Sequence, residues 1–265
     1  MPPGAIRRAA CASASRSSSV PDLAGRGVLI TGGGSGAGAD LARGFADAGA
    51  RVVIAGRRQG PLDAVAAATG AAAITADVTD EASVAAMFDA AGPVQIVIAN
   101  AGAADSAPFA RTTLEQWNAM LAVNLTGVFL TLREGLRRLD GWGRLISVAS
   151  TAGLKGYAYV APYVAAKHGV VGLTRSLAQE IARGPVTANA LCPGFLDTEM
   201  TDRSVDNIMR TTGRDREAAL KALTATNPQR RLIAPAEVTA AALWLCGPGS
   251  EGINGQAIAI AGGEV

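Results

Sequence analysis

The chain has 265 residues, of which 49% are hydrophobic and 17% are charged, so it can bury one large core. A net charge of +2 and an aromatic content of 4% offer neither the basic face nor the stacking platform of a nucleic-acid-binding module. The three cysteines are far apart and the chain has one histidine, which argues against a zinc site and indicates a reducing compartment. We therefore expect a cytoplasmic protein without a metal site.

The N-terminal segment differs in composition from the rest of the chain. It is rich in Ser, Ala and Arg, and the first acidic residue is Asp22. It lacks the apolar run of about 7–15 residues that a secretory signal requires. We expect residues 1–22 to form a disordered tail, with an organelle transit peptide as the alternative. No later segment has the ~18 consecutive apolar residues of a membrane span, so we expect no membrane partner.

From Gly27 onward, short apolar segments alternate with helical ones. The expected strands are 27–31, 51–55, 72–76, 94–99, 144–150, 186–191 and 257–261, and the longest expected helices are 114–139 and 157–183. This alternation predicts right-handed βαβ units around a parallel sheet. We expect residues 23–265 to form one doubly wound α/β domain, with seven mostly parallel strands and helices on both faces.

A glycine-rich run follows the first expected strand directly and opens a helix. In that position, backbone N–H groups and the helix N-terminus can hold a pyrophosphate. Glycines are also common in ordinary strand–helix turns, so the run alone is weak evidence. Two registers fit it equally well, Gly32-x-Gly34-x-x-Ala37 and Thr31-Gly32-x-x-x-Gly36-x-Gly38.

Tyr163 and Lys167 lie four residues apart in an Ala/Val-rich helical segment, which places them on one helix face. A free tyrosine has a pKa near ~10, and a neighbouring cation favours the phenolate. We therefore expect Lys167 to lower the pKa of Tyr163 toward the range in which general acid–base catalysis is efficient. Ser150 ends an expected strand and can offer a hydroxyl to the same substrate oxygen. A tyrosine and a lysine at this spacing also occur by chance, so whether the pair is catalytic depends on the motifs around it.

Together, these segments resemble the short-chain dehydrogenase/reductase family over about residues 24–263. The matching motifs occur in the family's order: Thr31-Gly32-x-x-x-Gly36-x-Gly38, Asp77-Val78, Asn100-Ala101-Gly102, Asn124, Ser150, Tyr163-x-x-x-Lys167, and Pro193-Gly194 followed by Thr198. The resemblance implies a Rossmann-type fold and an oxidoreductase that interconverts a carbonyl and a secondary alcohol with a nicotinamide cofactor.

The resemblance also implies the catalytic roles. Tyr163 would transfer the proton to or from the carbonyl oxygen, and Ser150 would polarise that carbonyl. Lys167 would lower the pKa of Tyr163 and hold the nicotinamide ribose, and Asn124 would support a water that relays protons. The implied cofactor contacts are Thr31, Gly32, Ser35, Gly36, Gly38, Asp77, Val78, Asn100, Gly102, Tyr163, Lys167, Pro193, Gly194 and Thr198.

The end of the second expected strand bears on the choice of cofactor. An acidic residue about 20 positions after the glycines would bind the ribose 2′-hydroxyl of NAD. Gly56 occupies that point here, followed by Arg57 and Arg58. A guanidinium can bind a 2′-phosphate bidentately. We therefore expect NADP(H) to be preferred, with NAD(H) as the alternative.

Fewer motifs in the sequence bear on the substrate than on the cofactor. Residues 195–231 lie where the family keeps its substrate loop, and their seven basic and six acidic residues suggest solvated helical faces. The tyrosine helix and the Pro193-Gly194 segment resemble 3-oxoacyl-thioester reductases and 3-hydroxybutyrate dehydrogenases. We expect reduction of a 3-oxoacyl thioester on CoA or an acyl carrier protein. The alternatives are a dehydrogenase of 3-hydroxybutyrate or another free alcohol, and a non-catalytic NADP-binding regulator. The family also suggests a homotetramer built through the two long helices.

Overall fold

The computed structural model describes residues 21–265, so the expected tail lies outside the described residues except for its last two positions. Seven strands form one sheet in the order β3-β2-β1-β4-β5-β6-β7, and every pairing between them is parallel. They are β1 (Gly27–Thr31), β2 (Arg51–Gly56), β3 (Ala72–Thr75), β4 (Ile96–Ala99), β5 (Gly143–Val148), β6 (Val186–Pro193) and β7 (Ala257–Ile260). The strand order reverses between β1 and β4, where ligands of such sheets bind.

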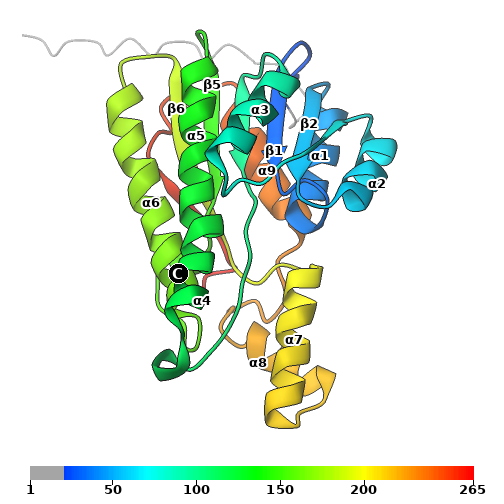
Figure 1. Ribbon diagram of the computed structural model, residues 1–265, viewed down its shortest axis with the longest axis vertical. Coiled ribbons are helices and arrows are strands. Elements are labelled where there is room, and N and C mark those ends of the chain that lie inside the picture. Colours follow the sequence, from blue (N-terminus) through cyan, green and yellow to red (C-terminus); the bar gives the residue numbers. More distant parts are fainter. Residues whose placement is uncertain (1–20) are drawn as a thin grey trace, which may run out of the picture.

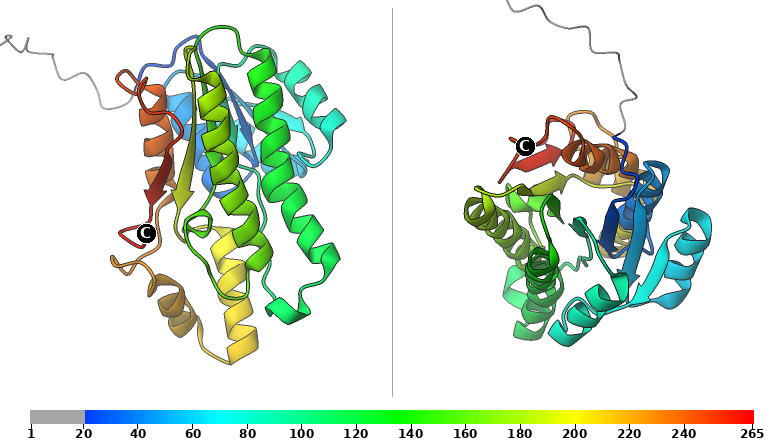
Figure 2. Two further views of the ribbon diagram at one scale, coloured as in Figure 1. Left: turned by 90° about the vertical axis from the view of Figure 1, so that its left-hand side faces the viewer. Right: turned by 90° about the horizontal axis from the view of Figure 1, so that it is seen from above.

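Helices cover both faces of this sheet (Figures 1 and 2). One face carries α1 (Gly36–Asp47), α2 (Gln59–Thr69) and α9 (Pro235–Cys246); the other carries α3 (Glu81–Ala91), α4 (Leu114–Leu121), α5 (Gly127–Arg138) and α6 (Ala161–Ile181). Strand side chains alternate between the two cores, since Leu29 packs into one while Val28 and Ile30 pack into the other. The predicted doubly wound α/β fold is confirmed.

Several expected boundaries were wrong, and three of these errors lie near the predicted site. The fifth strand ends at Val148, and Ser150 instead caps a short 3₁₀ turn, η3 (Thr151–Gly153). The helix expected over 114–139 is interrupted by a π-helical turn, η2 (Ala122–Thr126), which separates α4 from α5. The helix expected from residue 157 begins at Ala161, because Tyr159 has a φ of 69°, outside the right-handed helical region.

Residues 195–231, which we call the lid, fold into two helices beyond the carboxyl ends of the strands (Figure 1). The first is α7 (Glu199–Thr212), and it ends at Gly213 in the left-handed conformation. The second is α8 (Arg216–Thr224), capped by the Asp215 carboxylate, which accepts from the Ala218 N–H at 2.8 Å. Much of their surface is exposed, in agreement with the expected solvated helical faces.

One segment among the described residues, Leu114–Arg138, is long and apolar enough to cross a membrane by length and composition alone. In the structure its apolar residues are used in packing. Val128, Leu130 and Leu132 are buried in the core that covers one face of the sheet. Arg138, at the end of the segment, forms ion pairs with Glu134 and Asp89 at the surface. This packing accounts for the buried part of the segment, while Leu114 and Phe129 are exposed.

The amino ends of the strands are held by a buried arginine. Arg144, at the start of β5, is 1% exposed, and its hydrogen bonds go to backbone carbonyls. Nε donates to the Leu245 carbonyl at 2.9 Å, and Nη1 donates to those of Gly143 and Pro185 at 3.0 and 3.3 Å. Its guanidinium lies 4.4 Å from the centre of the Trp142 ring. Arg144 therefore joins β5, the residue before β6 and the end of α9.

Candidate active site

The predicted site residues lie at or beyond the carboxyl edge of the sheet, because each follows or ends a parallel strand. Thr31 ends β1, Arg57 follows β2, Asp77 follows β3, Asn100 follows β4, Ser150 follows β5, and Pro193 ends β6. Tyr163 and Lys167 lie in the first two turns of α6. The carboxyl ends of parallel strands meet at one edge, so a fold built from distant segments brings these residues together.

The glycine turn after β1 requires glycine at three positions. Gly32 and Gly36 have φ values of +67° and +53°, in the left-handed region that glycine adopts without strain. A Cβ on Gly38 would lie 2.1 Å from the Gly32 carbonyl oxygen, a distance at which the backbone would have to move. Of the two registers that fit the sequence, the structure supports Thr31-Gly32-x-x-x-Gly36-x-Gly38.

Two loops at the strand-order reversal are bonded to each other through Asn100. Its Nδ2 donates to the Thr31 carbonyl at 2.9 Å. The Thr31 hydroxyl in turn accepts from the backbone N–H groups of Asn100 and Ala101, both at 3.1 Å. Ser35 is the N-cap of α1 and makes no side-chain cap bond, so the first amides of that helix remain open to a ligand. The turn is therefore a preformed cradle for an anionic group.

The residues predicted to contact the adenosine end of the cofactor follow β2 and β3. Arg57 and Arg58 are both exposed just beyond β2. The Asp77 carboxylate accepts from the Thr79 N–H and hydroxyl at 2.9 and 2.8 Å. These bonds, with a smaller contribution from the positive charge of Arg57, lower the pKa of Asp77 against the opposing effect of burial. Val78 is buried against Gly127.

Ser150, Tyr163 and Lys167 are brought together as predicted. The Ser150 hydroxyl accepts from the Ala152 N–H at 3.1 Å, and it lies near enough to the Tyr163 phenol to favour its ionised form. Lys167 is 3% exposed, and its Nζ lies 5.6 Å from the centre of the Tyr163 ring. The Lys167 ammonium donates to the Val148 carbonyl at 2.8 Å, which fixes it beneath the end of β5.

The expected direction of the Tyr163 pKa was wrong. Burial raises the pKa of Tyr163, and the hydrogen bond with Ser150 offsets this only in part. Burial also lowers the pKa of Lys167 to about 8. Desolvation disfavours the charged form of each group, and it is the largest cause of both shifts. Tyr163 is therefore protonated at neutral pH, the state that a proton donor requires.

Asn124 lies in the π-helical turn and is fully buried. Its Nδ2 donates to the carbonyls of Ala103 and Met120 at 2.9 and 3.1 Å, and its Oδ1 accepts from the Ala103 N–H at 3.2 Å. A Cβ on Gly102 would lie 2.9 Å from Asn124 Oδ1 and 3.7 Å from Lys167 Nζ. Asn124 and Lys167 thus both lie beside Gly102, and the water-relay role of Asn124 stays a prediction.

The lid begins at the same edge. Gly194 donates its N–H to the Ile260 carbonyl at 3.0 Å, which holds the Pro193-Gly194 turn beside β7. Thr198, the N-cap of α7, has its methyl group 3.2 Å from the position a Cβ on Gly36 would occupy. The start of the lid therefore lies against the glycine turn.

Sequence reasoning missed a polar cluster next to Ser150. The Tyr157 phenol donates to Glu264 Oε1 at 2.5 Å and lies 2.7 Å from the Thr151 hydroxyl. Lys155 Nζ is 3.0 Å from the same Glu264 oxygen. Glu264 is far from Tyr157 in the sequence, and no motif connects them, so only the fold reveals this cluster.

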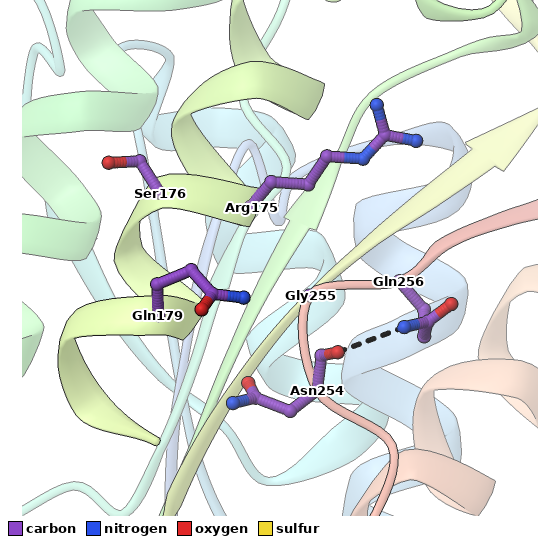
Figure 3. A pocket seen from close by; sticks show the side chains of 6 residues that line it. All are labelled: Arg175, Ser176, Gln179, Asn254, Gly255 and Gln256. Atoms are coloured by element: carbon purple, nitrogen blue, oxygen red, sulfur yellow. Dashed lines mark hydrogen bonds between the residues drawn. The ribbon is translucent and has the colours of Figure 1, made fainter.

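A separate hollow of about 460 Å³ lies between α6 and the segment before β7 (Figure 3). It is open to the surface and lined by Arg175, Ser176, Gln179, Asn254, Gly255 and Gln256. None of these is a predicted site residue, so the hollow is distinct from the centre around Tyr163. Within residues 21–265, no group of three His, Cys, Asp or Glu side chains gathers to hold a metal ion.

The fold and this site define a dinucleotide-binding oxidoreductase of the doubly wound α/β class. Residues 26–208 match the family model described as short chain dehydrogenase. The chain belongs to the short-chain dehydrogenase family and is an oxidoreductase that acts on CH–OH and C=O groups. The predicted family and enzyme class are confirmed.

Relatives of both predicted subgroups are similar to this chain. It is 35% identical over 249 residues to a putative ketoacyl reductase of Streptomyces coelicolor, a match that covers 89% of this chain and 95% of the relative. It is 33% identical over 250 residues to the D-beta-hydroxybutyrate dehydrogenase of Rhizobium meliloti, covering 89% and 97%. Among solved structures, a single-residue variant of actinorhodin polyketide ketoreductase with NADPH matches with a TM-score of 0.83 and 35% identity, covering 90% of this chain and 97% of that one.

Proposed function

We propose that this protein uses NADPH to reduce the ketone of a 3-oxoacyl thioester, carried on CoA or an acyl carrier protein, to the 3-hydroxy compound. The observation that carries the cofactor is that Gly56 stands where an acid would select NAD, with the exposed Arg57 and Arg58 directly after it. We infer reduction because NADPH is the cofactor that cells keep reduced. Similarity to a ketoacyl reductase and to a ketoreductase solved with NADPH supports the same assignment.

The residues present fit a dinucleotide. A Cβ at Gly32 or Gly38 would collide with Ala101, Asn100 or the Gly32 carbonyl, so the turn after β1 needs glycine there to keep its shape. The open amides at the start of α1 suit a pyrophosphate. Arg57 and Arg58 would hold the 2′-phosphate, and Pro193, Gly194 and Thr198 would lie beside the nicotinamide. When bound, the nicotinamide supplies the hydride.

The protein's own groups would handle the proton. Ser150 would donate a hydrogen bond to the substrate carbonyl oxygen and polarise it. Tyr163 would pass its phenolic proton to that oxygen as negative charge develops there. The buried Lys167 ammonium, held on the Val148 carbonyl, would stabilise the resulting phenolate at low local dielectric. Asn124 would keep Gly102 and the loop after β4 in place around Lys167.

We expect Arg57→Ala to weaken NADPH binding roughly tenfold to a hundredfold while changing NADH binding little. The reason is that a charge-assisted contact to phosphate is worth about 1.5–3 kcal/mol, and NADH has no 2′-phosphate. Dissociation constants for both cofactors, measured by nicotinamide fluorescence, test this. Arg43→Ala is a matched control, since it removes an exposed arginine on α1. An equal loss of affinity for NADPH and NADH would show that Arg57 does not bind the 2′-phosphate.

The substrate assignment is tested by comparing kcat/KM for acetoacetyl-CoA, a longer 3-oxoacyl thioester, free acetoacetate and a cyclic ketone. We expect the thioesters to be favoured by at least about tenfold, or roughly 1.4 kcal/mol of transition-state binding. Similarity to the D-beta-hydroxybutyrate dehydrogenase supports a second candidate, a dehydrogenase of a free secondary alcohol. Equal kcat/KM values for the thioesters and the free ketones would favour the dehydrogenase of a free secondary alcohol.

A further inference from the structure

The carboxylate of Glu264 is buried beside the proposed carbonyl site, although it lies one residue from the end of the chain. Its side chain is 1% exposed. Oε1 accepts from Tyr157 at 2.5 Å and faces Lys155 Nζ at 3.0 Å. Oε2 is buried as well, and within the described residues no donor reaches it. The nearby Thr226 hydroxyl donates instead to the Leu223 carbonyl at 3.1 Å.

This carboxylate carries its charge at neutral pH. Burial raises the pKa of Glu264, but the hydrogen bonds from Tyr157 and Lys155, with a further contribution from the nearby Thr226 hydroxyl, more than offset that effect, and the pKa lies below its usual value. Lys155 is 34% exposed and is the cation that faces the carboxylate. The cluster therefore holds a fixed negative charge whose second oxygen has no donor among the residues that the structure describes.

Several contacts place this charge next to the reacting groups. Thr151, which directly follows Ser150, lies 2.7 Å from the Tyr157 hydroxyl through its own hydroxyl. Tyr157 packs edge-to-face against Phe195 with 6.2 Å between ring centres. A Cβ on Gly194 would lie 3.3 Å from Glu264 Oε2. Glu264 is thus linked through two hydroxyl groups to the residue after Ser150, and it also contacts the turn at which the lid begins.

We propose that Glu264 is a specificity-determining residue that makes the carbonyl site select ketones whose neighbouring acyl group is uncharged and reject those that carry a carboxylate there. This rests on the proposed function, because it concerns the same site, and it would explain preference for a thioester over the free 3-oxo acid. A substrate carboxylate has two options beside this Tyr157–Glu264 cluster, and each is unfavourable. It can bind the partly exposed Lys155, which takes the cation from Glu264, or it can remain unpaired near the negative charge of Glu264.

The test separates charge from size by using acetoacetate and its methyl ester, which share one ketone. In the wild-type enzyme with NADPH, kcat/KM should be higher for the ester. Glu264→Gln keeps the shape and one acceptor oxygen but removes the charge. It should lower the ester-to-acid ratio about tenfold, or roughly 1.4 kcal/mol of transition-state discrimination, mainly by improving turnover of the acid.

Lys155→Met should change the ratio in the opposite direction. It removes the partly exposed cation and keeps the carboxylate, so the ester-to-acid ratio should rise by about threefold. Glu180→Gln, which removes an exposed carboxylate on α6, is the control for net charge and should leave the ratio unchanged. If Glu264 and Lys155 served only to hold the Tyr157–Glu264 cluster in place, each variant would lower kcat/KM for the acid and the ester equally.

An unchanged ester-to-acid ratio in Glu264→Gln, or a wild-type enzyme that handles acid and ester equally, would overturn the inference. Should Glu264→Gln fail to fold, the ester-to-acid ratio of Lys155→Met tests the proposal by itself. A ratio that is equal to or lower than that of the wild type also contradicts the proposal. The thioester comparison is independent of this pair. An enzyme that lacks thioester preference but still rejects the acid would refute the proposed substrate and leave the role of Glu264 intact.

Discussion

Replacing Tyr163 with phenylalanine is expected to lower kcat by about a hundredfold to ten-thousandfold, the range of general acid–base contributions. The variant keeps the ring that packs at the start of α6 and loses only the transferable proton. Because burial raises the pKa of Tyr163, the wild-type phenol is protonated at neutral pH and available for reduction. The deficit should therefore appear in the chemical step, with NADPH affinity nearly unchanged.

Stopped-flow measurement of NADPH oxidation in a single turnover separates that step from product release. Tyr159→Phe is the matched control, since this tyrosine is 66% exposed just before α6 and removing its hydroxyl should leave the rate as it is. Wild-type turnover in Tyr163→Phe would require another proton donor. A large loss of NADPH affinity would instead mean that the phenol acts mainly in binding.

Gly38→Ala is expected to weaken NADPH binding by at least about a hundredfold and to destabilise the fold by about 1–3 kcal/mol, the usual cost of overpacking. Its new methyl group would lie 2.1 Å from the Gly32 carbonyl oxygen and 2.7 Å from Asn100 Nδ2. Both contacts belong to the cradle, so the turn and the start of α1 would have to separate. Fluorescence titration with NADPH and urea unfolding measure the two effects.

Gly60→Ala provides the comparison, since a Cβ there meets nothing within 4 Å and the residue lies in the first turn of α2. It should bind NADPH normally and be at least as stable as wild type, because alanine favours helix more than glycine does. If Gly38→Ala bound NADPH as well as Gly60→Ala does, the cradle would not be the pyrophosphate site.

Much of the architecture could be predicted because parallel strands buried on both faces read as continuous apolar runs. The runs at β1, β2 and β4 are of this kind, and each is followed by a polar or glycine-containing loop. Since carboxyl ends share one edge, the order of strands was enough to gather Thr31, Asn100 and Ser150. Local spacing also placed Lys167 near Tyr163, because helix geometry fixes which residues share a face.

What could not be predicted depends on distances across the fold. The π-helical turn arises where Asn124 bonds to Ala103 on another segment, and the sequence around Asn124, which also contains Thr126 and Thr131, does not mark it. The direction of the Tyr163 pKa depends on how far water is excluded, which spacing does not reveal. Glu264 meets Tyr157 only after the chain has passed through two further strands and the lid.

The buried Arg144 has a consequence for how this enzyme can change over evolution. It secures the amino ends of β5 and β6, while Ser150 and Pro193 lie at or beyond the opposite ends of those strands. A strand of six residues such as β5 spans roughly 20 Å, and substitutions that far apart tend to add independently. Mutations that alter substrate choice at the carboxyl ends of these strands therefore leave the hydrogen bonds of Arg144 at the amino ends intact. The substrate can change during evolution without loss of this contribution to stability.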